Sequence, residues 1–185
     1  MKVIAALYVE ADGPYADLEG VDAWSIERDA RRYSGPHPVV AHPPCKRWGN
    51  YWYGSPSSPT RYNLGDDDGC FAHALYAVRT FGGVIEHPEG SAARAWFGLP
   101  DYPRLGWGWS NQADKYGGRS CLVTQGRYGH ASRKATWLYA VLPTFPALDF
   151  GDCRNMKPVE HLDKRGRFIT PLPFRDALLD MARSC

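Results

Sequence analysis

A cysteine stands in an unusual setting within the stretch "PVVAHPPCKRWGNYW", residues 38–52. Cys45 follows a short apolar run and two prolines, and Lys46, Arg47 and a cluster of aromatic residues come after it. A thiol is a strong nucleophile once it is ionised, and neighbouring cations favour the ionised form. We therefore expect a reactive thiol held on a loop, with a packed structural cysteine as the open alternative.

The elements that would position this thiol are predicted to alternate between strands and helices. Short apolar or β-branched runs bounded by turn residues predict strands at 2–9, 20–24, 38–42, 83–88, within 120–130 and at 135–142. Apolar spacing and end signals predict helices at 25–33, 66–83 and 171–185, with a long loop at 53–65. The prediction is one α/β domain over residues 1–185, a loop-rich, Rossmann-like three-layer sandwich with a mostly parallel sheet.

The strand at 38–42, the helix after it and the strand at 83–88 form a unit whose two strands should be parallel. In an open parallel sheet, ligands bind outside the carboxyl ends of the strands. Cys45 and Glu86 both fall at such ends. We therefore expect them to face the same site.

Composition sets wider limits. The five cysteines are odd in number and scattered, which is not typical of a secreted disulfide framework. No apolar run approaches the roughly 20 residues of a membrane span, so we expect a cytoplasmic protein without a membrane partner. Segments 30–65 and 115–148 contain no acid and five cations each. If they meet, they form a cationic face for a phosphate-bearing partner; alternatively, acids in 10–29 neutralise them.

Three short motifs add a resemblance to a known family. They are "PPC" at 43–45, "EHP" at 86–88 and "QGRYG" at 125–129. They resemble the proline-cysteine, Glu-Asn-Val and Gln-x-Arg-x-Arg motifs of the DNA cytosine-5 methyltransferases, in the same order and at comparable spacing. The resemblance covers residues 38–138 and implies a methyltransferase-like fold with each motif at the carboxyl edge of its sheet.

The resemblance implies a role for each residue that matches a motif. Cys45 would add to C6 of cytosine, Glu86 would hold the N3 and N4 edge, and Arg127 would support the O2 side of the ring. Other residues in or beside the motifs would contact the substrate; they are Pro44, Lys46, Arg47, Trp48, His87, Gln125 and His130. The neighbouring cations would hold phosphate and lower the pKa of the thiol.

Two departures from the family leave the cofactor and the substrate open. The resemblance implies S-adenosylmethionine, yet the family's glycine-rich cofactor loop is missing from "VEADGPYADLEG", residues 9–20. Acids near the first strands could still bind ribose hydroxyls; they are Glu10, Asp12 and Asp22. No target-recognition domain of the family's usual size fits after Gly129. The substrate would be DNA, single-stranded or duplex, or a pyrimidine nucleotide, with a protein partner supplying any target recognition.

The main alternative is a noncatalytic nucleic-acid or host-protein binding module, such as a bacteriophage anti-restriction or accessory protein acting in the host cytoplasm. Cys70 and His73, three residues apart, could provide half of a metal site, but core packing is the better interpretation and we predict no metal. Four tryptophans could stack on bases or cover the core; they are Trp48, Trp52, Trp107 and Trp109.

Overall fold

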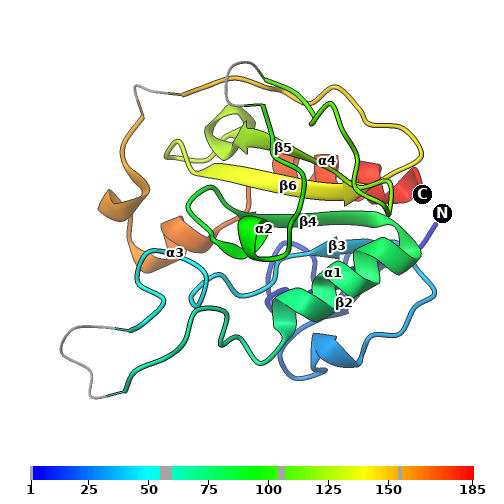
Figure 1. The fold of residues 1–185 in the computed structure, drawn as a ribbon, viewed down its shortest axis with the longest axis horizontal. Helices are drawn as coiled ribbons and strands as arrows, with labels where there is room; N and C mark the ends of the chain where they lie inside the picture. The colour runs from blue at the N-terminus through cyan, green and yellow to red at the C-terminus, as the bar shows by residue number, and fades with distance from the viewer. Residues whose placement is uncertain (1, 55–59, 104–106, 154–155) are drawn as a thin grey trace.

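The computed structural model describes residues 2–54, 60–103, 107–153 and 156–185. Its centre is a six-stranded sheet with the strand order β2-β1-β3-β4-β6-β5 (Figure 1). The strands are β1 (Ile4–Leu7), β2 (Val21–Trp24), β3 (Val39–Ala41), β4 (Gly83–Pro88), β5 (Arg119–Thr124) and β6 (Ala135–Val141). Strands β1 to β4 are parallel, and β6 is antiparallel to both β4 and β5. The protein is thus of the α/β class with a mixed, mostly parallel sheet.

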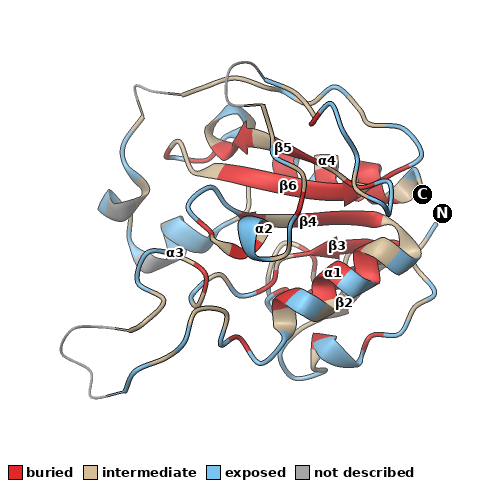
Figure 2. Ribbon diagram, viewed as in Figure 1, coloured by how far each residue is buried: buried red, intermediate tan, exposed pale blue. Residues whose placement is uncertain are grey.

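The two longest helices lie on opposite faces of this sheet (Figure 1). The helices are α1 (Cys70–Phe81), α2 (Ala93–Trp96), α3 (Lys164–Phe168) and α4 (Leu172–Arg183), with 3₁₀ turns η1 (Ala30–Arg32), η2 (Gln125–Tyr128) and η3 (Val159–His161). Strand residues alternate between the faces: Ala5 and Leu7 pack on the α1 side, and Ile4 and Ala6 on the α4 side. The central strands are therefore buried along most of their length (Figure 2).

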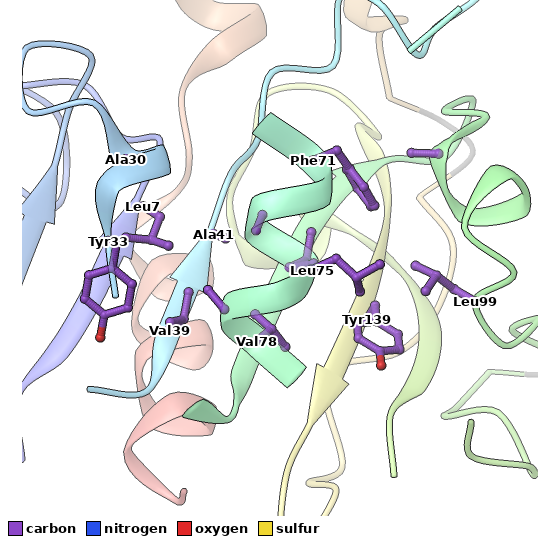
Figure 3. Close-up of a cluster of buried hydrophobic side chains, with 14 of the residues drawn as sticks. Leu7, Ala30, Tyr33, Val39, Ala41, Phe71, Leu75, Val78, Leu99 and Tyr139 are labelled. Carbon is purple, nitrogen blue, oxygen red and sulfur yellow. The ribbon is translucent and has the colours of Figure 1, made fainter. Parts of the chain in front are cut away.

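Helix α1 covers its face with a regular apolar stripe. Phe71, Leu75 and Val78 are each at most 4% exposed and pack against strand residues such as Val39 and Tyr139 (Figure 3). Burying side chains of this size stabilises the fold by roughly 1.5–3 kcal/mol each. This spacing is what predicted the helix from the sequence.

Glycines set the end of α1 and the start of β4. Gly82 is the C-cap, as predicted, with φ of 79°. Gly83 has φ of 117°, and a Cβ atom there would lie 1.9 Å from the carbonyl oxygen of Val39 on the neighbouring strand β3. Only glycine fits this approach, so the turn that brings β4 beside β3 depends on it.

The start of α1 depends on one buried carboxylate. The helix begins at Cys70, and the Asp67 side chain just before it is only 8% exposed. This carboxylate accepts hydrogen bonds from the backbone N–H of Phe71 at 2.9 Å and from Nε1 of Trp48 at 2.8 Å. It therefore caps the helix and fixes the Trp48 ring at the same time.

The variant Asp67→Ala should lower the free energy of unfolding by about 3 kcal/mol, because it removes a cap and leaves a buried indole N–H without a partner. Urea denaturation measures this difference. Asp66→Ala is the matched control, since the Asp66 side chain is exposed and its backbone, unlike that of Asp68, is not left-handed, and it should change the free energy by less than about 0.5 kcal/mol. Equal effects of the two variants would contradict the role of Asp67.

The helix predicted at 25–33 is wrong, because only Ala30–Arg32 form a 3₁₀ turn there. Asp29 adopts a left-handed backbone with φ of 52°, and its side chain accepts from the N–H of Arg31. The Ser25 hydroxyl donates to the Glu27 carboxylate. Local side-chain hydrogen bonds of this kind compete with helix formation.

Other boundaries differ less. The strand predicted within 120–130 ends at Thr124, and the first strand is shorter than predicted. Residues 55–59 of the loop predicted at 53–65 lie outside the described residues. Within the described parts of the chain, no helix is long and apolar enough to cross a membrane.

Candidate functional site at the carboxyl edge of the sheet

An open cleft of about 1440 Å³, here called the edge cleft, lies at the carboxyl ends of the parallel strands. Its lining comes from parts of segments 8–15, 42–45, 86–90, 133–135 and 158–170. The first three segments adjoin the ends of β1, β3 and β4. The chain continues from β1 to β2 on one side and from β3 to β4 on the other, so the cleft lies at the point where the strand order reverses. Ligands bind at this position in open α/β sheets.

Charge changes sign along the edge cleft. Glu10 and Asp12 line it after β1, and Arg133 and Lys134 line it just before β6. The sheet order separates β1 from β6 by β3 and β4. At the usual spacing between strands, the strand ends next to Glu10 and Asp12 and those next to Arg133 and Lys134 are about 14 Å apart. Cys45 and Glu86 come from the two strand ends between them.

Glu86 is fixed by hydrogen bonds to both carboxylate oxygens. Oε2 accepts from His42 Nδ1 at 3.0 Å, and Oε1 accepts from Gln125 Nε2 at 3.1 Å. Because an ionised carboxylate can only accept, His42 donates from Nδ1, and its Nε2 makes a hydrogen bond of 2.9 Å with the Tyr15 hydroxyl. Gln125 donates also to Oγ1 of Thr136. A buried chain of hydrogen bonds thus orients the carboxylate.

Burial and hydrogen bonding set the protonation states of the ionisable side chains in this site. Burial by itself raises the pKa of Glu86, but the His42 hydrogen bond and the charges of His42, Lys134 and His87 hold that pKa below its ordinary value. Burial lowers the pKa of His87 to about 4, with the charge of Glu86 opposing the shift. Burial also raises the pKa of Tyr15. At neutral pH the site therefore contains a carboxylate, a neutral His87 ring and a protonated phenol.

The pKa of Cys45 is raised, not lowered as the sequence predicted. Burial is the main cause and the negative charge of Glu86 adds to it, while Lys134 opposes both. The two cations that follow Cys45 in the chain do not line the cleft. Lys46 is exposed, and Arg47 stacks over the Tyr62 ring at 3.2 Å. The thiol therefore carries its proton in the free protein.

The pH dependence of Cys45 alkylation should reflect the raised pKa of this thiol. The rate of iodoacetamide modification should rise with pH through a midpoint above the ordinary thiol value of 9.0. The variant Glu86→Gln removes a negative charge beside the sulfur, so it should move this midpoint to lower pH. Peptide mass spectrometry distinguishes Cys45 from the other four cysteines. An unchanged or higher midpoint in the variant would contradict the coupling of Cys45 and Glu86.

The structure brings only part of the predicted site together. Of the residues predicted to act on the substrate or cofactor, those that line the edge cleft are Glu10, Asp12, Pro44, Cys45, Glu86 and His87. Gln125 does not line it but holds Glu86. Arg127 and Asp22 do not line the cleft. Arg127 is exposed and pairs with Asp149 at 2.6 Å, and Asp22 pairs with Arg28 at 2.6 Å.

Few of the ten cations of segments 30–65 and 115–148 reach the edge cleft. All ten lie in described parts of the chain, and only Arg133 and Lys134 line the edge cleft. Arg133 is itself paired, with Asp152 at 2.7 Å and Glu89 at 3.1 Å. The Lys134 ammonium donates to the Ile169 carbonyl at 2.7 Å. Glu89 and Asp152 therefore neutralise part of the positive charge that these two segments bring to the cleft.

Two more predicted contacts have structural partners. Trp48 is 2% exposed and packs against Phe71 and Phe97, so it covers the core and is not accessible for base stacking. The His130 ring is 2% exposed; Nδ1 accepts from the Ser132 N–H at 3.0 Å, and Nε2 donates to the Gly166 carbonyl at 3.0 Å. His130 thus joins the segment before β6 to α3.

The ring nitrogens of His73 are also engaged. Nε2 donates to the Tyr33 carbonyl at 3.0 Å, and Nδ1 accepts from the Tyr8 hydroxyl at 3.1 Å. These bonds leave no ring lone pair for a metal. Within the described residues, no group of three or more His, Cys, Asp or Glu side chains could hold a metal ion.

Sequence reasoning missed three residues of the site, namely Tyr15, His42 and Lys134. His42 stands directly before the Pro43-Pro44-Cys45 run, and Tyr15 follows the first strand in "DGPY". Their positions at strand ends were a usable signal, because such positions face the ligand edge. Their pairing was not predictable, since it joins residues 27 positions apart.

Comparisons of the chain with protein-family models, with curated proteins and with solved structures gave no match. Its function is therefore inferred from the edge cleft itself.

Proposed function

We propose that this protein modifies cytosine at C5 on a Rossmann-like, methyltransferase-like scaffold, with the Cys45 thiol as nucleophile and the Glu86 carboxyl at the N3 and N4 edge of the base. One observation carries the proposal: a half-buried thiol and a carboxylate oriented by two hydrogen bonds line the same cleft at the ends of the neighbouring parallel strands β3 and β4. A thiol that adds to a ring and a carboxyl that polarises it are the two groups this chemistry needs.

The reaction begins with a proton on the sulfur. The proton leaves Cys45 and a proton is supplied at N3 through Glu86, so the thiol and carboxylate become a thiolate and a carboxylic acid without net proton uptake. The sulfur adds to C6, which makes C5 nucleophilic. A bound sulfonium donor would supply the methyl group to C5 and would leave as a neutral thioether. The C5 proton then passes to solvent water, the Cys45 thiolate is expelled, and the N3 proton returns through Glu86 to the sulfur, which restores the aromatic ring, the carboxylate and the thiol.

The chain's residues divide these tasks within the cleft. His42, held by Tyr15, keeps the Glu86 carboxyl oriented. Lys134 is the cation whose charge acts on both Glu86 and Cys45. We assign it the support of the ring, because Arg127 would have to leave Asp149 to reach the base. Glu10 and Asp12, on the β1 side, could accept hydrogen bonds from the hydroxyl groups of a donor such as S-adenosylmethionine.

The test is covalent trapping. The protein is incubated with a single-stranded oligonucleotide containing 5-fluorocytosine, with and without S-adenosylmethionine, and analysed by intact mass spectrometry. Fluorine at C5 cannot leave as a proton does, so a methylated adduct stays on the enzyme. We expect an adduct that requires the donor. An adduct without the donor would support thiol addition but contradict methyl transfer, and no adduct with an oligonucleotide, a duplex or free 5-fluorodeoxycytidine monophosphate would contradict the proposal.

A second candidate is the noncatalytic binding module, and the raised pKa of Cys45 favours it, since the free protein does not activate its thiol. This candidate predicts salt-sensitive binding of nucleic acid that the variants Cys45→Ser and Glu86→Gln leave unchanged, together with no adduct. Binding that falls on substitution of Glu86 would exclude it.

A further inference from the structure

Two arginines on one side of the edge cleft have no carboxylate partner among the residues that the structure describes. Arg165 and Arg167 line the cleft and are exposed. Within the described residues no ion pair joins either of them to an acid, and the one side-chain hydrogen bond is a long contact from Arg167 Nε to the Asp163 carbonyl at 3.4 Å. Arg133, which also lines the cleft, is by contrast paired with Glu89 and Asp152. Unpaired guanidinium groups in a cleft are available for an anion.

The helix that carries these arginines is held in place from both sides. The Asp163 carboxylate accepts from the Gly166 N–H at 2.6 Å, and His130 Nε2 donates to the Gly166 carbonyl at 3.0 Å. Just after the helix, Lys134 Nζ donates to the Ile169 carbonyl. Gly166 lies between the two arginines in the sequence, so the hydrogen bonds from Asp163 and His130 fix the backbone that carries both arginine side chains. The arginines are thus fixed to the segment that precedes β6.

This anchoring places the unpaired cations at a defined part of the cleft. Lys134 is adjacent to β6, and its charge acts on both Cys45 and Glu86. The acids Glu10 and Asp12 belong to the β1 side. Figure 1 shows α3 at the left of the view, the side toward which β4 runs. A ligand whose ring reaches the ends of β3 and β4 would therefore extend its anionic part toward α3.

We propose that Arg165 and Arg167 form a binding subsite for a phosphate group attached to the pyrimidine that reaches Cys45 and Glu86. The guanidinium plane offers paired donors that match two phosphate oxygens, which gives short, charge-assisted hydrogen bonds. The identity of the base rests on the proposed function, whereas the phosphate contact does not. Deoxycytidine monophosphate and a DNA strand carry the same chemistry, so both belong in the test.

The test compares binding with and without the phosphate. Isothermal titration calorimetry of the full chain measures deoxycytidine, deoxycytidine monophosphate and a short oligodeoxycytidine, for the wild type and for Arg165→Gln/Arg167→Gln. We expect the wild type to bind at least one phosphate-bearing ligand at least about tenfold more tightly than deoxycytidine, and the variant to lose most of this gain. The slope of log affinity against log salt should fall by about one for each phosphate contact removed.

The matched control is Arg32→Gln/Lys115→Gln, because both residues are exposed, do not line the cleft and together carry the same charge as the two arginines. Loss limited to the monophosphate identifies a nucleotide, and loss limited to the oligonucleotide identifies a strand. Equal affinities with and without phosphate, or equal effects of the control and of Arg165→Gln/Arg167→Gln, would overturn the subsite. Deoxyadenosine monophosphate separates the two proposals: arginine-dependent binding as tight as that of deoxycytidine monophosphate would retain the phosphate subsite and contradict the cytosine assignment.

Discussion

The variant Cys45→Ser is expected to lose turnover by at least about a thousandfold and to form no adduct with 5-fluorocytosine. Serine places a hydroxyl where the sulfur would attack, and a hydroxyl is a far weaker nucleophile toward C6 because it ionises only at much higher pH. The substitution is nearly isosteric and Cys45 is half-buried, so the fold and substrate binding should change little. Turnover is measured by transfer of a labelled methyl group, and binding by calorimetry.

Cys70→Ser is the matched control for this variant. Cys70 is also half-buried, but it starts α1 and does not line the edge cleft. We expect this variant to retain activity within about twofold. Retained turnover in Cys45→Ser would exclude the thiol mechanism, and equal loss in both variants would indicate a general effect on stability.

The variant Glu86→Gln is expected to reduce kcat by about a hundredfold or more, which is the usual contribution of a general acid. Glutamine keeps the size of the side chain but cannot supply a proton to N3. In the wild type the reactive form holds one proton shared between the thiol and the carboxyl. Its kcat/KM should therefore be level between a lower limit below the ordinary glutamic acid value of 4.5 and an upper limit above the ordinary thiol value of 9.0.

The shape of the pH profile distinguishes this role from a structural one. Without the carboxyl, the remaining activity depends on the thiolate fraction, so kcat/KM of Glu86→Gln should rise about tenfold per pH unit up to the thiol pKa. His42→Gln keeps the carboxyl but loses the ring that supports the low pKa of Glu86, so it should keep the plateau and move its lower limit upward. A level profile in Glu86→Gln would contradict the proton role of Glu86.

Much of the fold could be predicted because its elements follow from local patterns. The apolar spacing of α1, the glycine pair that ends it and the buried run of β4 each determine their element within a few residues. The helix predicted at 25–33 failed because Asp29 adopts a left-handed backbone that residue spacing does not reveal. Helices as short as α2 and α3 depend on tertiary contacts, such as that of His130 with Gly166, and have no sequence signal of their own.

Site residues that follow a strand could be predicted from the sequence. Side chains whose position depends on an ion pair or a stacking partner could not. Cys45 and Glu86 were placed at one edge because they follow predicted parallel strands, and both line the edge cleft. Arg127 was placed there by motif alone, but η2 directs it to Asp149. The thiol pKa was expected to be low from cations adjacent in sequence; burial and Glu86 dominate because those cations extend elsewhere.

Peptide mapping of the trapped adduct tests the central inference most directly. After incubation with the 5-fluorocytosine oligonucleotide and S-adenosylmethionine, the protein is digested and the nucleotide-bearing peptide is sequenced by tandem mass spectrometry. We predict a single modified residue, Cys45, with no adduct in Glu86→Gln at neutral pH over the same time. Modification of Cys70, Cys121, Cys153 or Cys185 instead, or an adduct that forms equally well without Glu86, would contradict a reaction site at the ends of β3 and β4.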